Sequence, residues 1–193
     1  MANATLNTAQ NASFTYAHQI TIAPKEPWNK KHTALAKSAL QSLFDECERK
    51  YILFATQRGI PCTLELSRQN MPLAQLSREL VMNAGDSIIE LERTRPAGNG
   101  TVIISLACTQ SQLVLKVEDN GTGIPENAKL FKKTESGKIG LSGGKGGGLY
   151  LLQKTLTTLG GQAGFQRKPQ GSMVFYTVPI NALIICKATS AAA

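Results

Sequence analysis

The sequence has few of the features that mark membrane-bound or secreted proteins. No apolar run approaches the roughly 20 residues that a membrane-spanning helix needs. The N-terminal stretch "MANATLNTAQNASF" has no basic region followed by an apolar one, so it does not look like a signal peptide. We therefore expect no membrane segment in this chain and a cytoplasmic location.

Cysteine is also scarce, and its four occurrences are far apart: Cys47, Cys62, Cys108 and Cys186. No two of them have the C-x-x-C spacing of a zinc site or a redox motif. The pattern indicates neither a metal site nor a disulfide framework, and it favours a reducing compartment. We expect Cys47 and Cys62 to lie in the core rather than to act as redox sensors.

Aromatic residues make up only 6% of the 193 residues, although the net charge is +8. A basic protein can bind nucleic acid, an acidic membrane surface or a small polyanion. Because few aromatics lie near the lysine-rich part of the chain, a base-stacking surface is not supported, and we expect no nucleic-acid partner. The lysines that crowd the glycine-rich region instead favour a phosphate-containing ligand: Lys129, Lys132, Lys133, Lys138 and Lys145.

Length and periodicity predict a single α+β domain. Strands are predicted over residues 14–23, 62–66, 101–108, 113–119 and 172–180, and helices over 33–58, 72–93 and 149–160. The apolar runs at 102–106 and 113–117 indicate central strands. The apolar side of the first helix contains Leu35, Ala39, Leu43, Cys47, Tyr51 and Phe54. The segment "LIICKATSAAA" is predicted as either a short strand or simply an end. These elements fit a two-layer sandwich, in which a mixed, mostly antiparallel sheet is covered on one face by about three helices. Residues 1–13 are expected to form a flexible arm, 14–180 the domain and 181–193 a tail.

The second predicted helix has an apolar stripe made of Leu80, Ala84, Ile88 and Leu91. A polar stripe lies on a separate side and consists of Glu79, Asn83, Asp86 and Glu90. An ordinary solvated face is one interpretation. Asn83 and Gly85 favour a functional one, because both are poor helix formers that a purely structural helix rarely contains mid-span. The Asn83 carbonyl oxygen suits a hard cation such as Mg²⁺. Glu79, one turn earlier, could accept a proton or order a water.

Two glycine-rich segments follow. In "VEDNGTGIP", Asp119 ends an apolar strand, and Gly121 and Gly123 make the turn after it pliable. In "SGGKGGGLYLL", five glycines in seven residues precede the third helix. Backbone amides of such a loop, a helix N-terminus and Lys145 would suit phosphate oxygens. A flexible linker looks similar, but the amphipathic helix and the lack of serine repeats argue against one. Neither a Walker A loop nor a dinucleotide-binding fingerprint is present.

Taken together and in this order, three segments resemble the GHKL superfamily of gyrase, heat-shock chaperone, histidine-kinase and mismatch-repair ATPases. "ELVMNAGDS" looks like the N-box, "DNGTGIP" like the first glycine box and "GKGGGL" like the second, within a resemblance over about residues 30 to 180. The chain looks most like the ATP-binding catalytic domain of sensor histidine kinases, on "ATQRGIPCTLEL" and "LGGQAGFQRKPQGSMVFYTVP". "LFKKTESGK" before "GKGGGLYLL" is similar to the lid of the citrate- and dicarboxylate-sensing branch.

The resemblance implies the Bergerat fold and a site for ATP and Mg²⁺. Asp119 would accept a hydrogen bond from the adenine amino group and would reject guanine, and Asn83 would hold Mg²⁺. Glu79 is placed like the water-activating glutamate of the hydrolysing branches, so it is the catalytic candidate. Residues 126–143 would form the ATP lid. The other residues implied in ATP binding are Asp86, Gly121, Gly123, Lys133, Lys138, Gly144, Gly146, Gly148 and Leu149.

The sequence departs from the kinase pattern at the phosphoacceptor. His18 is followed by Gln19 in a strand-like run, and His32 by Thr33, whereas a phosphoacceptor histidine usually lies on a helical hairpin before an acidic residue. We therefore expect transfer of the γ-phosphoryl group to a histidine on a separate module or partner. Two alternatives stay open: a stand-alone ATPase or nucleotide-gated switch, and an anti-sigma-type serine/threonine kinase. Because no dimerising hairpin is evident, we expect a monomer or a weak dimer.

Overall fold

The structure is a computed structural model that describes residues 14–23, 26, 28–57, 62–64, 66, 72–94, 98–109, 111–126, 130–131 and 148–186. Its elements in chain order are β1 (Phe14–Ile22), α1 (Lys30–Gln57), β2 (Cys62–Leu64), α2 (Pro72–Thr94), β3 (Gly100–Cys108), β4 (Gln112–Asp119), α3 (Gly148–Thr158), β5 (Gln162–Arg167), β6 (Ser172–Pro179), a 3-10 turn η1 (Ile180–Ala182) and β7 (Ile184–Cys186). The predicted α+β class is confirmed.

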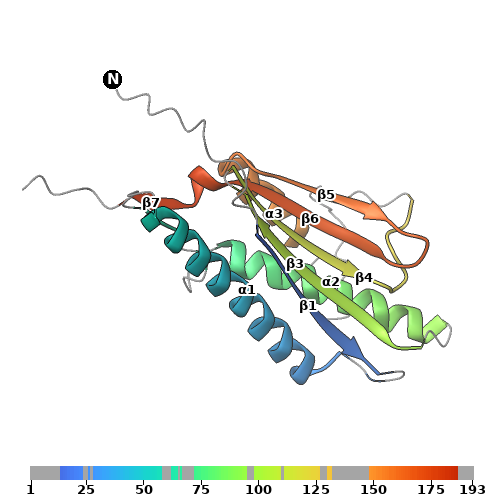
Figure 1. Ribbon diagram of the computed structural model, residues 1–193. Helices are drawn as coiled ribbons and strands as arrows, with labels where there is room; N and C mark the ends of the chain where they lie inside the picture. The colour runs from blue at the N-terminus through green and yellow to red at the C-terminus, as the bar shows by residue number, and fades with distance from the viewer. Residues whose placement is uncertain are drawn as a thin grey trace, which may run out of the picture.

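Five strands form the main sheet in the order β1-β3-β4-β6-β5, and every neighbouring pair is antiparallel. The helices form one layer (Figure 1): α1 contacts β1 and β3, α2 contacts β3 and β4, and α3 contacts β5 and β6. Neighbouring helices also contact one another. The predicted sandwich of a sheet with helices on one face is therefore confirmed. The hydrophobic core lies between the two layers, and β4 brings Asp119 to the middle of one sheet end.

Helix α1 begins three residues before its predicted start, because Asn29 caps it. The Asn29 side-chain oxygen accepts hydrogen bonds from the backbone N–H groups of Lys31 (2.9 Å) and His32 (3.2 Å). The predicted apolar side is largely right, since Ala39, Leu43, Cys47 and Tyr51 are buried. The prediction was wrong for Leu35, because this side chain is 43% exposed and not part of the buried side. The side chain of Phe54 lies outside the described residues.

Helix α2 buries the stripe predicted for it, Leu80, Ala84, Ile88 and Leu91. Its mid-span glycine has a packing cause. A Cβ atom on Gly85 would lie 2.6 Å from Cδ2 of Trp28, whose indole covers α2 and donates a hydrogen bond to Thr33 Oγ1 (3.1 Å). Packing against Trp28 is therefore sufficient to explain Gly85, and Trp28 packs against the core.

The C-terminal part differs most from the predicted elements. Strand β5 was not predicted, because it is short, polar and interrupted by Gly164. Of the two alternatives for the last segment, the structure has the short strand β7, which pairs with β2 in a separate two-stranded sheet. Leu183, just before β7, is buried in the core. Figure 1 shows β7 beside the end of α1.

Among the described residues, no helix has the length and apolar character to cross a membrane. No three His, Cys, Asp or Glu side chains within the same ranges are grouped so that they could hold a metal ion.

Candidate functional site

The site is built around the carboxylate of Asp119, which is 6% exposed at the end of the central strand β4. Three segments hold it. Its Oδ1 accepts hydrogen bonds from Ser87 Oγ on α2 (3.2 Å) and from the Gly121 N–H in the following turn (2.9 Å). Its Oδ2 accepts a hydrogen bond from Ser172 Oγ at the start of β6 (2.7 Å). The carboxylate therefore joins the helix layer, the glycine turn and the sheet.

Burial and hydrogen bonding have opposite effects on the pKa of Asp119. Desolvation raises the pKa of Asp119 above its ordinary value, although hydrogen bonds from Ser172, Gly121 and Ser87 favour the charged form and lower it. Burying a carboxylate costs free energy unless it has partners, and perturbed carboxyls gather at functional sites. The arrangement identifies Asp119 as the leading candidate for a ligand-binding group.

The glycine at position 121 is required by the approach of α2. A Cβ atom there would lie 2.6 Å from the backbone nitrogen of Ile88, so any larger residue would push the turn off the helix. The Thr122 N–H also donates to the Ser87 carbonyl (3.1 Å). The first glycine box therefore packs directly against α2, the helix that carries the predicted N-box.

Gly123 is required by its backbone conformation. Its φ is +77°, and a Cβ atom would lie 2.8 Å from the carbonyl oxygen of Gly171. Its N–H donates to Ser87 Oγ (3.3 Å). The predicted turn therefore needs both glycines: Gly121 because α2 approaches closely, and Gly123 because of its backbone conformation.

The loop that continues from this turn is clamped by Arg167, at the end of β5. Its guanidinium donates hydrogen bonds to three successive carbonyl oxygens: Ile124 (3.0 Å), Pro125 (2.8 Å) and Glu126 (3.1 Å). On the other side, Asn120 Oδ1 accepts a hydrogen bond from the Thr101 N–H (2.7 Å). The backbone around Asp119 is therefore fixed from both sides before any ligand binds.

The start of α3 approaches the polar stripe of α2. A Cβ atom on Gly148 would lie 3.3 Å from Oε2 of Glu79, so the end of the second glycine box and the catalytic candidate are neighbours. Glu79 and Asn83 are both exposed, Asp86 is half-buried, and Leu149 packs against the core. The structure therefore brings the N-box and the first residue of α3 together, as the motif order implies.

Four predicted site residues lie outside the described residues: Lys133, Lys138, Gly144 and Gly146. Their assignment to ATP stays a prediction from the resemblance.

Three residues that shape the site were not predicted as site residues: Ser87, Ser172 and Arg167. Ser87 is the last residue of the N-box segment "ELVMNAGDS", and Ser172 follows the Gly171 turn at the start of an apolar strand, so each had a local signal. Their convergence on Asp119 depends on the pairing of β4 with β6 and on the packing of α2. Those contacts are not visible in a single sequence.

A pocket of about 220 Å³ lies beside the glycine turn. Gly121 and Gly171, which both approach Asp119, line it together with Leu91, Ile124 and Arg167. Both basic residues that line it already have partners: Arg167 binds the loop carbonyls, and Lys168 pairs with the Glu118 carboxylate.

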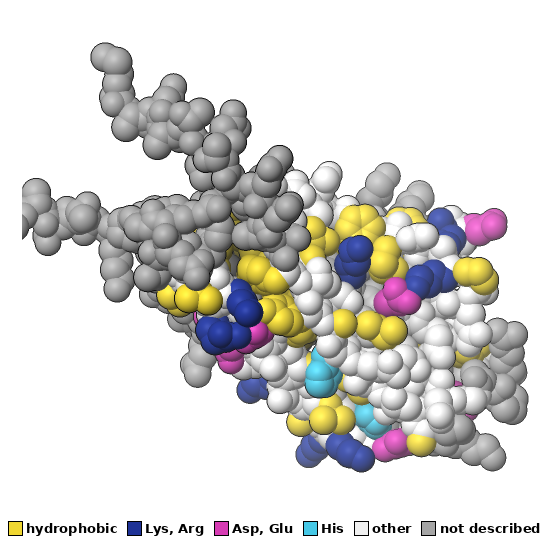
Figure 2. Space-filling view, in the orientation of Figure 1, with side chains coloured by type: hydrophobic (Ala, Val, Ile, Leu, Met, Phe, Trp, Pro, Cys, Tyr) yellow, Lys and Arg dark blue, Asp and Glu magenta, His cyan; other side chains and the backbone are white. Residues whose placement is uncertain are grey.

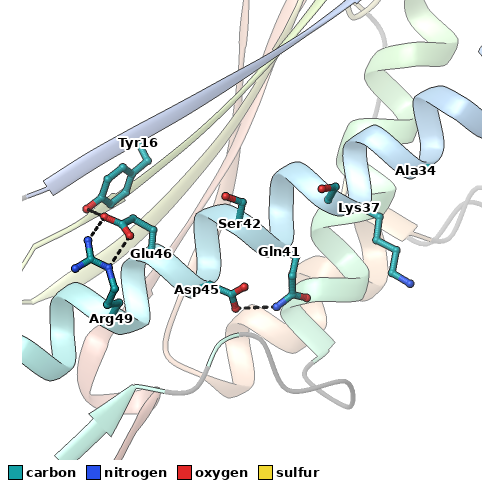
Figure 3. A pocket seen from close by; sticks show the side chains of 9 residues that line it. Tyr16, Ala34, Lys37, Gln41, Ser42, Asp45, Glu46 and Arg49 are labelled. Carbon is teal, nitrogen blue, oxygen red and sulfur yellow. Dashed lines mark hydrogen bonds and ion pairs between the residues drawn. The ribbon is translucent and has the colours of Figure 1, made fainter.

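A larger cavity of about 820 Å³ follows the outer side of α1 next to Tyr16, away from every predicted site residue. Figure 3 shows Tyr16 of β1 reaching Glu46, which Arg49 binds with two hydrogen bonds of 2.6 and 2.8 Å. These bonds lower the pKa of Glu46 to about 2, while partial burial and the Glu46 contact raise the pKa of Tyr16 to about 12. The network fastens α1 to β1.

On the face in Figure 2, basic side chains are interspersed with acidic and apolar ones.

The family assignment agrees with this geometry. The model of the family of histidine kinase-, DNA gyrase B-, and HSP90-like ATPases matches residues 69–182, more than half of the chain. The chain belongs to this family, and the resemblance predicted from its three motifs is confirmed.

Individual relatives are sensor kinases. The chain is 25% identical over 150 residues to the alginate biosynthesis sensor protein KinB of Pseudomonas aeruginosa, across 76% of this chain and 25% of that protein. It is 29% identical over 154 residues to the signal transduction histidine-protein kinase BarA of Escherichia coli K12, across 71% of this chain and 16% of that protein. The chain thus spans a quarter or less of these relatives.

The solved catalytic domain of the histidine kinase ThkA is similar at a TM-score of 0.49 and 16% identity, across 84% of this chain and 96% of that one.

Proposed function

We propose that this chain binds Mg-ATP and transfers the γ-phosphoryl group to a histidine on a separate module or partner protein. The buried Asp119 carboxylate carries the proposal, because two hydroxyls and one backbone amide hold it in a fixed position. The amino group of adenine is a donor that fits such an acceptor. Guanine presents a carbonyl oxygen at the same place and would meet the carboxylate acceptor to acceptor. Asp119 therefore selects ATP over GTP.

The phosphates extend from the base toward the start of α3. The proximity of Glu79 and Gly148 supports this direction, since it brings the polar stripe of α2 to a helix N-terminus. Asn83 would hold Mg²⁺, whose charge would offset that of the phosphates. By the resemblance, Gly144, Gly146 and Gly148 would line the phosphates, with Leu149 just beyond them, and Asp86 would belong to the same site. Lys133 and Lys138 would be the lid cations.

The phosphoacceptor lies outside this chain. His32 is 2% exposed and lies 3.7 Å from the Glu26 carboxylate, which makes it inaccessible to a phosphate donor. His18 lies within the strand β1. A partner histidine would attack the γ-phosphorus, ADP would leave, and catalysis would come from positioning and charge neutralisation. We place this reaction in the cytoplasm, with the chain as a monomer or weak dimer.

The test is phosphotransfer in trans. The chain is incubated with Mg-[γ-³²P]ATP and a protein that carries a histidine on a helical hairpin. We expect labelled hairpin whose phosphate is lost in acid and kept in base, which distinguishes phosphohistidine from phosphoserine. Replacement of the hairpin histidine by alanine is the control. Acid-stable label would instead favour the anti-sigma-type serine/threonine kinase.

One observation favours a second candidate, an ATPase or nucleotide-gated switch. Glu79 is exposed beside Gly148, where a carboxylate could orient a water toward the phosphates. Steady release of phosphate without any partner, abolished by Glu79→Gln, would support this function over phosphotransfer.

A further inference from the structure

The fold brings the four scattered cysteines together in two pairs. Cys47 of α1 and Cys108, the last residue of β3, are in side-chain hydrogen-bond contact and are 0% and 1% exposed. Cys62 and Cys186 are directly opposite one another in the antiparallel pair of β2 and β7. All four come from different elements, so no spacing in the sequence indicates either pair.

The β2–β7 register satisfies the backbone requirement of a disulfide. Opposite residues of antiparallel strands have Cα atoms about 4.5 to 5.5 Å apart, whichever kind of pair they form. A disulfide needs a Cα separation of about 4.4 to 6.8 Å. We propose that Cys62 and Cys186 form a thiol–disulfide site that reacts with a small disulfide such as glutathione disulfide. This modification site is independent of the proposed kinase activity.

Buried anchors next to both strands fix the register. Leu66, just after β2, is 1% exposed, and its N–H donates a hydrogen bond to the Glu48 carboxylate of α1. Before β7, Ile180 and Leu183 are 4% and 3% exposed, and the Ile180 N–H donates to the Ser111 carbonyl (2.9 Å). Because the core holds both flanks, Cys62 and Cys186 stay opposite one another.

The reaction consists of two thiol–disulfide exchanges. One cysteine thiolate attacks glutathione disulfide, forms a mixed disulfide and releases one glutathione thiolate. The second cysteine thiolate attacks the mixed disulfide at the protein sulfur and releases the other. Two protein thiols are oxidised, two glutathione thiols are produced, and the chain loses two hydrogens.

The second pair provides an internal comparison. The Cys47–Cys108 hydrogen bond raises the pKa of Cys47 and lowers the pKa of Cys108, so it is burial that protects this pair. Core packing also excludes a molecule the size of glutathione. Cys47 and Cys108 therefore stay reduced under conditions that oxidise Cys62 and Cys186.

Oxidation links the last described strand to the segment between α1 and α2. Strands β2 and β7 have three residues each and pair only with one another among the described strands, and so small a sheet is marginal by itself. A disulfide that closes a loop on the order of 100 residues restricts the unfolded chain strongly. We expect the oxidised form to unfold about 5–10 °C higher than the reduced form.

The experiment incubates the full chain with glutathione disulfide or with dithiothreitol, followed by intact-mass analysis and non-reducing peptide mapping. The expected result is a loss of about 2 Da and a cross-linked peptide pair joining Cys62 to Cys186, while Cys47 and Cys108 remain alkylatable after denaturation. Cys62→Ser and Cys186→Ser should each abolish both the link and the rise in unfolding temperature. Free thiols at all four positions after oxidation, persistent glutathione adducts, or a link between Cys47 and Cys108 would overturn the proposal.

Discussion

At the scale of single residues, Asp119 is a buried carboxyl with a proposed role in ATP binding, and its effects on stability and on binding can be measured separately. Asp119→Asn keeps the shape of the side chain and removes the charge. We expect ATP affinity to fall about 10- to 100-fold, the usual range for a lost hydrogen bond to a charged group. Binding is measured by calorimetric titration, and an unchanged affinity would exclude Asp119 as the adenine acceptor.

The same substitution has a pH-dependent effect on stability. Because burial raises the pKa of Asp119 in the folded state, its contribution to stability is fully present below the unfolded pKa and is lost as pH rises through the folded pKa. Asp119→Asn does not titrate, so its stability relative to the parent should increase from acidic to neutral pH. Urea denaturation at several pH values measures this difference, and a difference that shrinks toward neutral pH would contradict the sign.

Ser87 is the hydroxyl that connects α2 to the glycine turn. Besides Asp119, its Oγ contacts the Gly123 N–H (3.3 Å) and Thr122 Oγ1 (3.2 Å). Ser87→Ala should reduce the free energy of unfolding by about 1–2 kcal/mol and should weaken ATP binding several-fold, because it leaves buried polar groups with one partner fewer. The matched control is Thr158→Ala, which removes an exposed hydroxyl from the end of α3 and should change stability by less than about 0.5 kcal/mol.

At the scale of elements, the contact between Trp28 and Gly85 explains how the segment before α1 is fastened to α2. Gly→Ala in a helix interior normally stabilises by about 1 kcal/mol. Gly85→Ala should instead destabilise by about 1–3 kcal/mol, because the added methyl overlaps the indole. In a Trp28→Ala background the same change should become neutral or stabilising. Denaturation of the four proteins of this cycle gives the coupling, and an equal effect of Gly85→Ala in both backgrounds would argue against the contact.

The helices and central strands were predictable because their apolar residues recur with clear periods. Ile104, Leu106 and Leu115 are fully buried, as the apolar runs of the two central strands suggested. Strand β5 was missed because an edge strand needs few apolar residues, and the start of α1 was missed because the capping role of Asn29 was overlooked. In the site, Asp119 and its glycines carry local motifs. The hydroxyls of Ser87 and Ser172 reach Asp119 only because α2 packs against the sheet and β4 pairs with β6. No local sequence pattern indicates these long-range contacts.

At the scale of the whole molecule, the described residues form a sheet-and-helix sandwich in which His32 of α1 is buried and His18 lies in the strand β1, so neither histidine is on a helical hairpin. We therefore expect that the chain alone, given Mg-[γ-³²P]ATP, acquires no acid-labile label, and that His32→Gln does not alter transfer to an added hairpin, because His32 is buried. Autoradiography after gel electrophoresis measures both. Label on His18 or His32 would contradict the assignment of the acceptor to a partner.

The central claim is that the Asp119 site recognises adenine, and calorimetric titration of the purified chain with ATP and then GTP in Mg²⁺ tests it most directly. We expect binding of ATP, at least tenfold weaker binding of GTP, and loss of the preference in Asp119→Asn, since one mismatched hydrogen bond is worth about 1.4 kcal/mol or more. Equal binding of both nucleotides, or no binding of ATP by the folded chain, would contradict it.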